Sequence, residues 1–399
     1  MTCTSNTANR IDDYTSPKAR PRLNSIDLLR GLAIVLMALD HTRDFFGASG
    51  QNPRDIAQPA LFLTRWITHF CAPTFILLAG VSAYLYGTHG RNTREISLFL
   101  LTRGLWLIFI EFTVVGFGWN LGFGSGLFIA QVMWAIGGSM IILAGLVYLP
   151  RSAIAAVALA MIAGHDLFDG IRAETLGSAS WLWNLLHQPA LLEISFRVKL
   201  LVVYPLLPWP AVMAAGYIMG PLYKRAPEHR HLLLLCTGGA LIVGFIVLRA
   251  TNVYGDPVGW SKQATWLGTL LSFIDCEKYP PSLLFLMMTL GPALILLALF
   301  ERTDSMVARS LTRFGRVPFL FYVVHLPLLH ALAVVLAWFT LDHVGWMFGS
   351  FVPNKPVGYG LSLFGIYAVW ISVLLMLYPL CSWFAALKAR RHDWWLSYL

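Results

Sequence analysis

Charge is scarce in this sequence of 399 residues. Charged residues make up 12% of the chain and apolar residues 57%. In a soluble domain, about 25% of the residues are charged and about 45–50% are apolar. This shortage excludes a soluble globular enzyme and a disordered chain, and it indicates a polytopic membrane protein. Each span needs about 20 mostly apolar residues. Long apolar runs are plentiful and the alternation of a membrane β-barrel is absent, so the sequence predicts helical spans.

Cysteine is also rare, and several familiar motifs are missing. The five cysteines argue against a disulfide scaffold, and no pair has the spacing of metal ligands: Cys3, Cys71, Cys236, Cys276 and Cys381. The first 25 residues are polar and lack the apolar core of a cleavable signal peptide. Without a phosphate-binding glycine loop, an HExxH motif or a GxSxG motif, ATPase, zincin and α/β-hydrolase functions have no support.

Ten apolar segments predict about ten transmembrane helices, at residues 26–46, 67–87, 96–116, 127–149, 151–166, 200–220, 231–249, 281–300, 317–338 and 358–384. Lys and Arg collect in the N-terminal tail, in the even-numbered loops and in the C-terminal tail. By the positive-inside rule, both termini are then cytoplasmic. We therefore expect an all-α polytopic bundle, with a polar tail over residues 1–22 and a transmembrane domain over residues 23–399.

The net charge of +9 is explained by this topology, so we expect a lipid bilayer around the protein and no nucleic-acid partner. Oligomer formation is left open. Long segments at residues 47–66, 167–199 and 250–280 fall on the extracytoplasmic side. Segments this long inside a compact bundle are often functional.

The first predicted span carries an unusual set of ionisable residues. Arg30 and His41 are eleven residues apart, which is three helical turns, so they share one face at a separation of roughly 16 Å. A cation near the cytoplasmic mouth suits a phosphate group, and a deeper histidine suits a general base. An acyl-coenzyme A on this face would place its phosphates at Arg30 and its thioester near His41. Alternatively, Arg30 is a positive-inside anchor and His41 an interior histidine.

Two carboxylates are spaced to assist this pair. Asp27 precedes Arg30 by three residues and can hold its guanidinium in place. Asp44 follows His41 by three residues and can orient the imidazole and stabilise its cation, as carboxylates do in catalytic triads. Glu111, deep in the third predicted span, is costly there, so we expect it either to pair with Arg103 or to be protonated.

The chain resembles bacterial relatives of the heparan-α-glucosaminide N-acetyltransferase catalytic domain, in the transmembrane acyltransferase superfamily. The matching pieces are Ser25-Ile26-Asp27-Leu28-Leu29-Arg30-Gly31, Tyr204-Pro205-Leu206-Leu207-Pro208-Trp209, Tyr254-Gly255-Asp256-Pro257, Lys278-Tyr279-Pro280-Pro281-Ser282 and Phe314-Gly315-Arg316-Val317-Pro318. The spacing of Arg30 and His41 is similar to the motif of bacterial polysaccharide O-acyltransferases. The resemblance implies transfer of an acetyl group from cytoplasmic acetyl-CoA to an acceptor across the membrane.

The lysosomal member of the family places its catalytic histidine in the loop after the first family helix. Residues 42–65 of this chain contain no histidine, so His41 and His69 are the candidates. The predicted site then has catalytic residues His41, Asp44 and His69, coenzyme-binding residues Arg30, Asp27 and Arg316, and acceptor-binding residues Asp256, Trp260 and His325. Simpler roles stay open: an interfacial His69, a turn at Asp256, an aromatic belt at Trp260 and a topogenic Arg316.

The sequence thus predicts an integral membrane acyltransferase that uses acetyl-CoA as donor and needs no metal. Its acceptor is a sugar or a related molecule on the extracytoplasmic side, and His41 is its general base. By resemblance, we place it in a bacterial inner membrane. The alternatives are a multi-pass transporter of a small solute or lipid-linked sugar, and a non-catalytic protein that keeps the fold. Transporters often have two related halves, which this sequence does not show.

Overall fold

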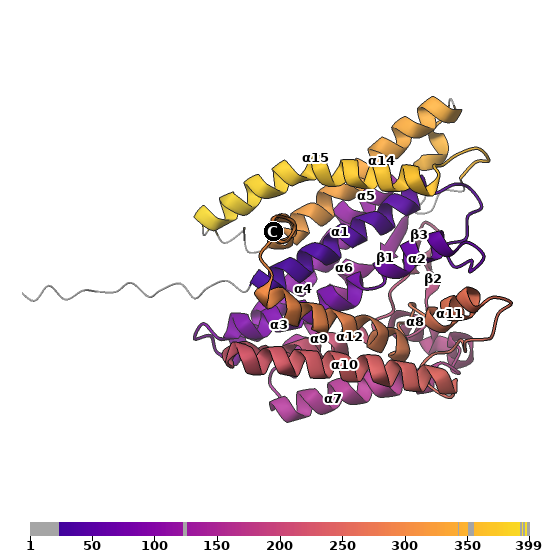
Figure 1. Cartoon of the computed structure of the whole chain (residues 1–399). Helices are drawn as coiled ribbons and strands as arrows, with labels where there is room; N and C mark the ends of the chain where they lie inside the picture. The colour runs from indigo at the N-terminus through magenta and orange to yellow at the C-terminus, as the bar shows by residue number, and fades with distance from the viewer. Residues whose placement is uncertain are drawn as a thin grey trace, which may run out of the picture.

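The protein is described from a computed structural model, which covers residues 24–122, 126–341, 343–349, 355–391, 393 and 396. Most described residues lie in helices that run side by side (Figure 1). Their bounds are α1 (Asn24–Phe46), α2 (Pro59–Thr68), α3 (Cys71–Gly87), α4 (Thr93–Ile110), α5 (Gly116–Asn120), α6 (Val132–Leu146), α7 (Arg151–Gly164), α8 (Ser180–Leu186), α9 (Trp209–Met219), α10 (Pro227–Thr251), α11 (Trp266–Ile274), α12 (Leu283–Leu299), α13 (Met306–Arg316), α14 (Pro318–Leu341) and α15 (Leu363–Arg390).

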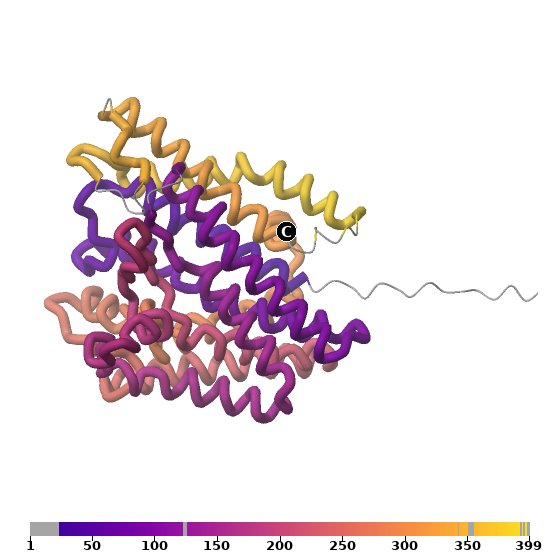
Figure 2. The backbone as a smooth tube through the Cα atoms, turned by 180° about the vertical axis from the view of Figure 1, so that it is seen from behind, coloured from indigo at the N-terminus to yellow at the C-terminus, as the bar shows by residue number. Residues whose placement is uncertain are grey.

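Seven helical segments of the described chain are long and apolar enough to cross a membrane. They are Pro59–Gly87, Thr93–Asn120, Arg151–Phe168, Pro227–Thr251, Leu283–Arg302, Pro318–Leu341 and Leu363–Arg390. Each corresponds to one of the ten predicted spans, including the short one predicted at residues 151–166. The two views of the bundle place α7 and α15 at opposite edges (Figure 1, Figure 2).

The other three predicted spans differ from this pattern. Helix α1 is 23 residues long, but it carries too many ionisable residues to count among the helices that are apolar enough to cross a membrane. Helices α6 and α9 have only 15 and 11 residues, too few to cross about 30 Å of hydrocarbon at 1.5 Å per residue. Most residues of α9 are buried, so it is enclosed by protein, where incomplete spans are tolerated.

A small sheet corrects the expectation of a purely helical fold. Strand β1 (Leu127–Ala130) pairs in parallel with β3 (Val198–Val202), which pairs antiparallel with β2 (Ala190–Ser195). The predicted spans at residues 127–149 and 200–220 therefore begin as strands. Short apolar runs do not distinguish a buried strand from a helix, and Pro205 and Pro208 follow β3 directly and delay the helix to Trp209.

Helix α1 lies in the middle of the molecule, between α14 and α15 on one side and α3 on the other (Figure 1). It crosses α13 at a point where both helices carry glycine. A methyl group on Gly315 would overlap the backbone carbonyl of Asp27, and one on Gly31 would overlap that of Leu311. The two backbones therefore touch, and this contact fixes the end of α1 that carries Arg30.

Candidate functional site

Two cavities lie at opposite ends of α1. The first has a volume of about 360 Å³ and is lined by Arg30, Ile34 and Met37 of α1; we refer to it as the Arg30 cavity. The second, of about 580 Å³, is lined by His41 and Asp44 of α1 and by loop residues that include Lys278; we refer to it as the Lys278 cavity. The eleven-residue spacing of Arg30 and His41 thus follows one stripe of α1 from one cavity to the other.

The Arg30 cavity is cationic at one end and apolar elsewhere. Four basic side chains line it: Arg30, Arg103, Arg316 and Lys388. Its remaining wall is mostly apolar or aromatic and includes Met37, Leu107, Met133 and Tyr322. This combination suits a ligand with a phosphorylated head and a slender, weakly polar arm.

Arg30 is held in place by three elements. Its Nη1 donates to the Asp27 carboxylate at 3.2 Å and to the Gly315 carbonyl at 3.3 Å, and its Nη2 donates to the Ser82 hydroxyl at 3.2 Å. Arg316 approaches the other oxygen of Asp27 at 3.9 Å. The carboxylate predicted to hold Arg30 therefore bridges two arginines of the cavity wall, which orders both of them.

The Lys278 cavity is rich in charge. Lys278 is buried, with Nζ 3.8 Å from Asp40. Burial lowers its pKa, but the nearby Tyr279 and Asp40 raise it more, so the pKa of Lys278 lies above its usual value. Lys355 donates to the carbonyl of Gly47 at 2.8 Å, and burial lowers the pKa of Lys355 to about 8. Lys278 and Lys355 therefore both bring positive charge to the lining of this cavity at neutral pH.

His41 makes its closest side-chain contact with another histidine. Its Nδ1 lies 2.7 Å from Nε2 of His325, and the two rings stack at 5.0 Å. Nδ1 of His325 lies 3.0 Å from the carbonyl of Phe321. Because a carbonyl only accepts, Nδ1 of His325 carries a hydrogen and its Nε2 accepts from Nδ1 of His41. His41 is thereby left with its lone pair on Nε2, the form that a general base requires.

The boundary between the cavities passes through this histidine pair. On α1, Met37 lines the Arg30 cavity, whereas His41, one turn later, lines the Lys278 cavity. At the start of α6, Gln131 lines the Lys278 cavity and Met133 lines the Arg30 cavity. Tyr322 lines the Arg30 cavity and packs 6.2 Å from the His41 ring. The side chains around His41 thus form the partition between the two cavities.

Glu111 stabilises the same partition. It lies in a π-helical segment (Glu111–Val115), and its carboxylate accepts from the backbone N–H groups of Met133 and Trp134 at 2.9 and 3.2 Å. Helix α6 has no cap from its own Gln131 side chain, so Glu111 supplies one from another helix. These backbone donors, in place of the expected Arg103, are the partners that the described residues give to the Glu111 carboxylate, and they offset the cost of burying it.

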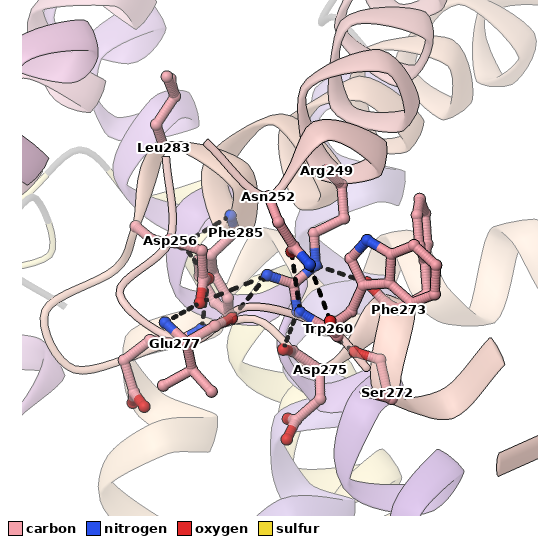
Figure 3. A network of polar contacts seen from close by, with 12 residues as sticks. Arg249, Asn252, Asp256, Trp260, Ser272, Phe273, Asp275, Glu277, Leu283 and Phe285 are labelled. Atoms are coloured by element: carbon pink, nitrogen blue, oxygen red, sulfur yellow. Dashed lines mark hydrogen bonds and ion pairs between the residues drawn. The ribbon is translucent and has the colours of Figure 1, made fainter. Parts of the chain in front are cut away.

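Arg249 organises the loop that carries Lys278. This side chain is 1% exposed and donates to the carbonyls of Val258, Ser272, Phe273 and Asp275 (Figure 3). The carboxylate of Asp256 lies 3.6 Å away and accepts from Ser282 and from the backbone of Glu277. These contacts hold residues 256–282 as a compact unit and so place Lys278 in the cavity wall.

The structure separates the predicted site residues into groups. Arg30 and Arg316 line the Arg30 cavity, and Asp27 binds both. His41 and Asp44 line the Lys278 cavity, but Asp44 pairs with Arg43 at 2.8 Å, and the partner of His41 is His325. The sequence missed this partner, because residues 284 positions apart leave no local pattern.

Three predicted residues lie elsewhere. His69 is fully buried at the junction of α2 and α3, packs against Phe285, and lines neither cavity. Asp256 belongs to the Arg249 network, and Trp260 packs against Phe273 beside it. None of the three lines either cavity. Within the described residues, no group of three or more His, Cys, Asp or Glu side chains is placed to hold a metal ion.

Several residues of the Lys278 cavity were missed by the sequence analysis. Tyr204, Lys278 and Tyr279 occur in motifs that carried the resemblance, but no ligand-binding role was predicted for them. Arg65 and Lys355 were not predicted as ligands either. All five line the cavity. The sequence did contain one signal for this cavity. Lys278 stands directly before Tyr279 and two prolines, and such a lysine is unusual in a chain so poor in charge.

A family model described as "Heparan-alpha-glucosaminide N-acetyltransferase, catalytic" matches residues 22–248, which is more than half of the chain. A comparison with curated protein sequences finds no match. The matched range contains His41, the sheet and the α1 side of both cavities. Lys278, His325 and Lys355 lie beyond it.

Proposed function

The chain belongs to the family of the heparan-alpha-glucosaminide N-acetyltransferase catalytic domain, an acyltransferase family, and on this premise we propose that it moves an acetyl group across a membrane from acetyl-CoA to a sugar-like acceptor. Its apolar helices and its family make it an integral membrane protein. The Arg30 end of α1 faces the cytoplasm of a bacterial cell, and the Lys278 cavity faces the other side of the inner membrane. The orientation is supported by the distribution of basic residues, and the location in a bacterial inner membrane is supported by the resemblance alone.

The observation that carries this proposal is the position of His41 at the partition between two cavities. The donor enters the Arg30 cavity, with phosphates at Arg30 and Arg316 and the pantetheine arm along the apolar wall. The acceptor enters the Lys278 cavity. Neither substrate then has to cross the membrane, because the thioester and the accepting group meet at His41.

The transfer balances with His41 as the only base. Nε2 of His41 takes the proton from the acceptor hydroxyl or amine as its oxygen or nitrogen attacks the thioester carbonyl carbon. The carbon–sulfur bond breaks, and the coenzyme A thiolate leaves and takes the proton from the imidazolium. His325 keeps His41 in the required tautomer, a task that a carboxylate performs in catalytic triads.

Acetyl-CoA binding and acetyl transfer test this proposal in purified, detergent-solubilised protein. We expect Arg30→Ala to weaken acetyl-CoA binding about 10- to 100-fold in calorimetry, since it removes a charged hydrogen-bonding group worth about 1.5–3 kcal/mol. Arg309→Ala is the matched control, because Arg309 lies at the same end on α13 but outside the cavity. Wild-type protein that is folded and binds no acetyl-CoA would contradict the proposal.

The histidines should affect the rate and not donor binding. With glucosamine as the acceptor probe, His41→Ala should lower the rate of transfer by about 10²–10⁴ and leave the dissociation constant of acetyl-CoA unchanged. His325→Phe should lower kcat and leave KM for acetyl-CoA unaltered, because it removes the acceptor that fixes the tautomer. His89→Ala, at an exposed histidine, is the control. Full activity in His41→Ala would remove it from the mechanism.

A further inference from the structure

We propose that the acceptor carries an anionic group, a carboxylate or a phosphate, beside the hydroxyl or amine that is acylated. This inference rests on the proposed function, because it identifies the substrate class of the Lys278 cavity. It is carried by the charges that line this cavity and by their distances from one another.

The described lining of the cavity has an excess of positive charge. Its four basic side chains are Arg43, Arg65, Lys278 and Lys355, and its two carboxylates are Asp40 and Asp44. Both carboxylates are used by a single cation, since Arg43 approaches each of them at 2.8 Å. The acidic side chains of the wall therefore leave the other three cations largely uncompensated.

Each of these three cations either lies at a long distance from a carboxylate that another cation also contacts, or has no carboxylate nearby. Lys278 is 3.8 Å from Asp40, which already binds Arg43. Arg65 is 3.7 Å from Asp275, which it shares with Arg54. Lys355 has no carboxylate within 4.0 Å among the described residues, and its close contact is the neutral carbonyl of Gly47. Buried charges without a good counterion are costly, so these cations favour an anionic ligand.

The position of Lys355 relative to His41 also suits a sugar that carries an anionic group. Lys355 contacts Gly47, six residues after His41, which corresponds to about 9 Å along the helix axis. An anion bound by Lys355 then lies one sugar ring away from the atom that His41 deprotonates. Tyr204 and Tyr279 also line the cavity, with rings 5.0 Å apart, and aromatic side chains provide flat apolar surface for such a ring.

A neutral sugar would leave the cations of the cavity without a counterion. It would displace water from Lys278 and Lys355 without returning a charge, which makes its binding less favourable. A carboxylate or phosphate forms charge-assisted hydrogen bonds with the same groups. The cavity therefore selects its acceptor by charge, in addition to presenting it to His41.

Calorimetry with matched sugars tests the inference on the full-length protein in detergent. Methyl β-glucuronide carries a carboxylate, glucose 6-phosphate carries a phosphate, and methyl β-glucoside is the neutral control. A short prenyl-phosphate-linked glucose tests a lipid source of the anion. We expect at least one anionic sugar to bind about tenfold or more tightly than the glucoside. Lys355→Gln should weaken that binding about 10- to 100-fold, whereas Lys355→Arg should retain it.

The controls separate this inference from the proposed transfer reaction. Lys199→Gln removes an exposed lysine on β3, outside the cavity, and should change nothing. Acetyl-CoA binding is measured on the same samples. If acetyl-CoA binds and all sugars bind equally or not at all, the anionic acceptor is excluded and the transfer proposal stands. If an anionic sugar binds through Lys355 and acetyl-CoA does not, the site is supported and the transfer proposal fails.

Discussion

Single residues in this protein owe their chemistry to their neighbours. The lone pair of His41 lies on Nε2 because the Phe321 carbonyl fixes the hydrogen of His325, and His325 in turn fixes the hydrogen of His41. Lys355 is a second case, because burial lowers its pKa to about 8 against the opposing effect of Asp44. The charge of Lys355 is therefore nearly complete at pH 7 and is lost as the pH rises through about 8.

This behaviour predicts a pH-dependent affinity for the anionic acceptor. The carboxylate of methyl β-glucuronide stays ionised between pH 7 and 9.5, and Lys278 stays charged because its pKa is raised. Among the basic side chains of the described cavity lining, Lys355 is the one with a pKa near 8, and Asp44 and Arg43 face it from α1. Calorimetry should therefore show weaker binding as the pH rises above 8 in the wild type and a constant affinity in Lys355→Arg. An equal decrease in both proteins would assign the titration to another group.

At the scale of elements, the crossing of α1 and α13 positions the residues at the basic end of the Arg30 cavity. Glycine on both helices lets the backbones touch, and the carbonyl of Gly315 at the contact accepts from Arg30. Arg316, the last residue of α13, binds Asp27 of α1. The basic mouth of the Arg30 cavity therefore depends on the spacing of these two helices.

Separating these helices should weaken both stability and donor binding. Gly315→Leu inserts a side chain where only backbone fits, so we expect a loss of about 1–3 kcal/mol in the free energy of unfolding. Acetyl-CoA binding should weaken as well, since Arg30 and Arg316 move apart. Thermal unfolding in detergent and calorimetry measure the two effects. Gly145→Ala, at a position with open space, should lower neither quantity. A fully stable Gly315→Leu would show that the contact is not required.

At the scale of the whole molecule, the two cavities open at opposite ends of the central helix. Asp304 lies in the loop before α13, at the Arg30 end, and its side chain is exposed. Val357 is 94% exposed and lies two residues after Lys355, at the other end. If the donor and the acceptor come from opposite sides of the membrane, these two positions must also lie on opposite sides.

Cysteine labelling of intact cells tests this topology. A membrane-impermeant maleimide should label Val357→Cys from outside, and it should label Asp304→Cys only after the membrane is permeabilised. The unaltered chain gives the background from its own cysteines. Labelling of both positions from outside would rule out the two-sided reaction. Uptake of a labelled sugar by proteoliposomes without acetyl-CoA would instead favour the transporter that the sequence also allowed.

The sequence by itself determined that this is a helical membrane protein of an acyltransferase family. A shortage of charge and long apolar runs leave few alternatives, because the bilayer requires every backbone polar group to be bonded within the protein. The spacing of Arg30 and His41 on one helical face was likewise local information, since residues on one helix keep a fixed geometry. Seven predicted spans are confirmed as apolar helices for the same reason.

Only the tertiary structure decided which residues meet. Strands β1 and β3 replaced the starts of two predicted helices because their pairing joins segments about 70 residues apart. The partner of His41 is His325, and the wall of the Lys278 cavity combines Arg65 of α2 with Lys278 and Lys355 from two loops. Such contacts depend on how helices pack and where a buried arginine such as Arg249 anchors a loop. No periodicity in the chain encodes them, because packing and charge pairing act between residues that are distant in sequence.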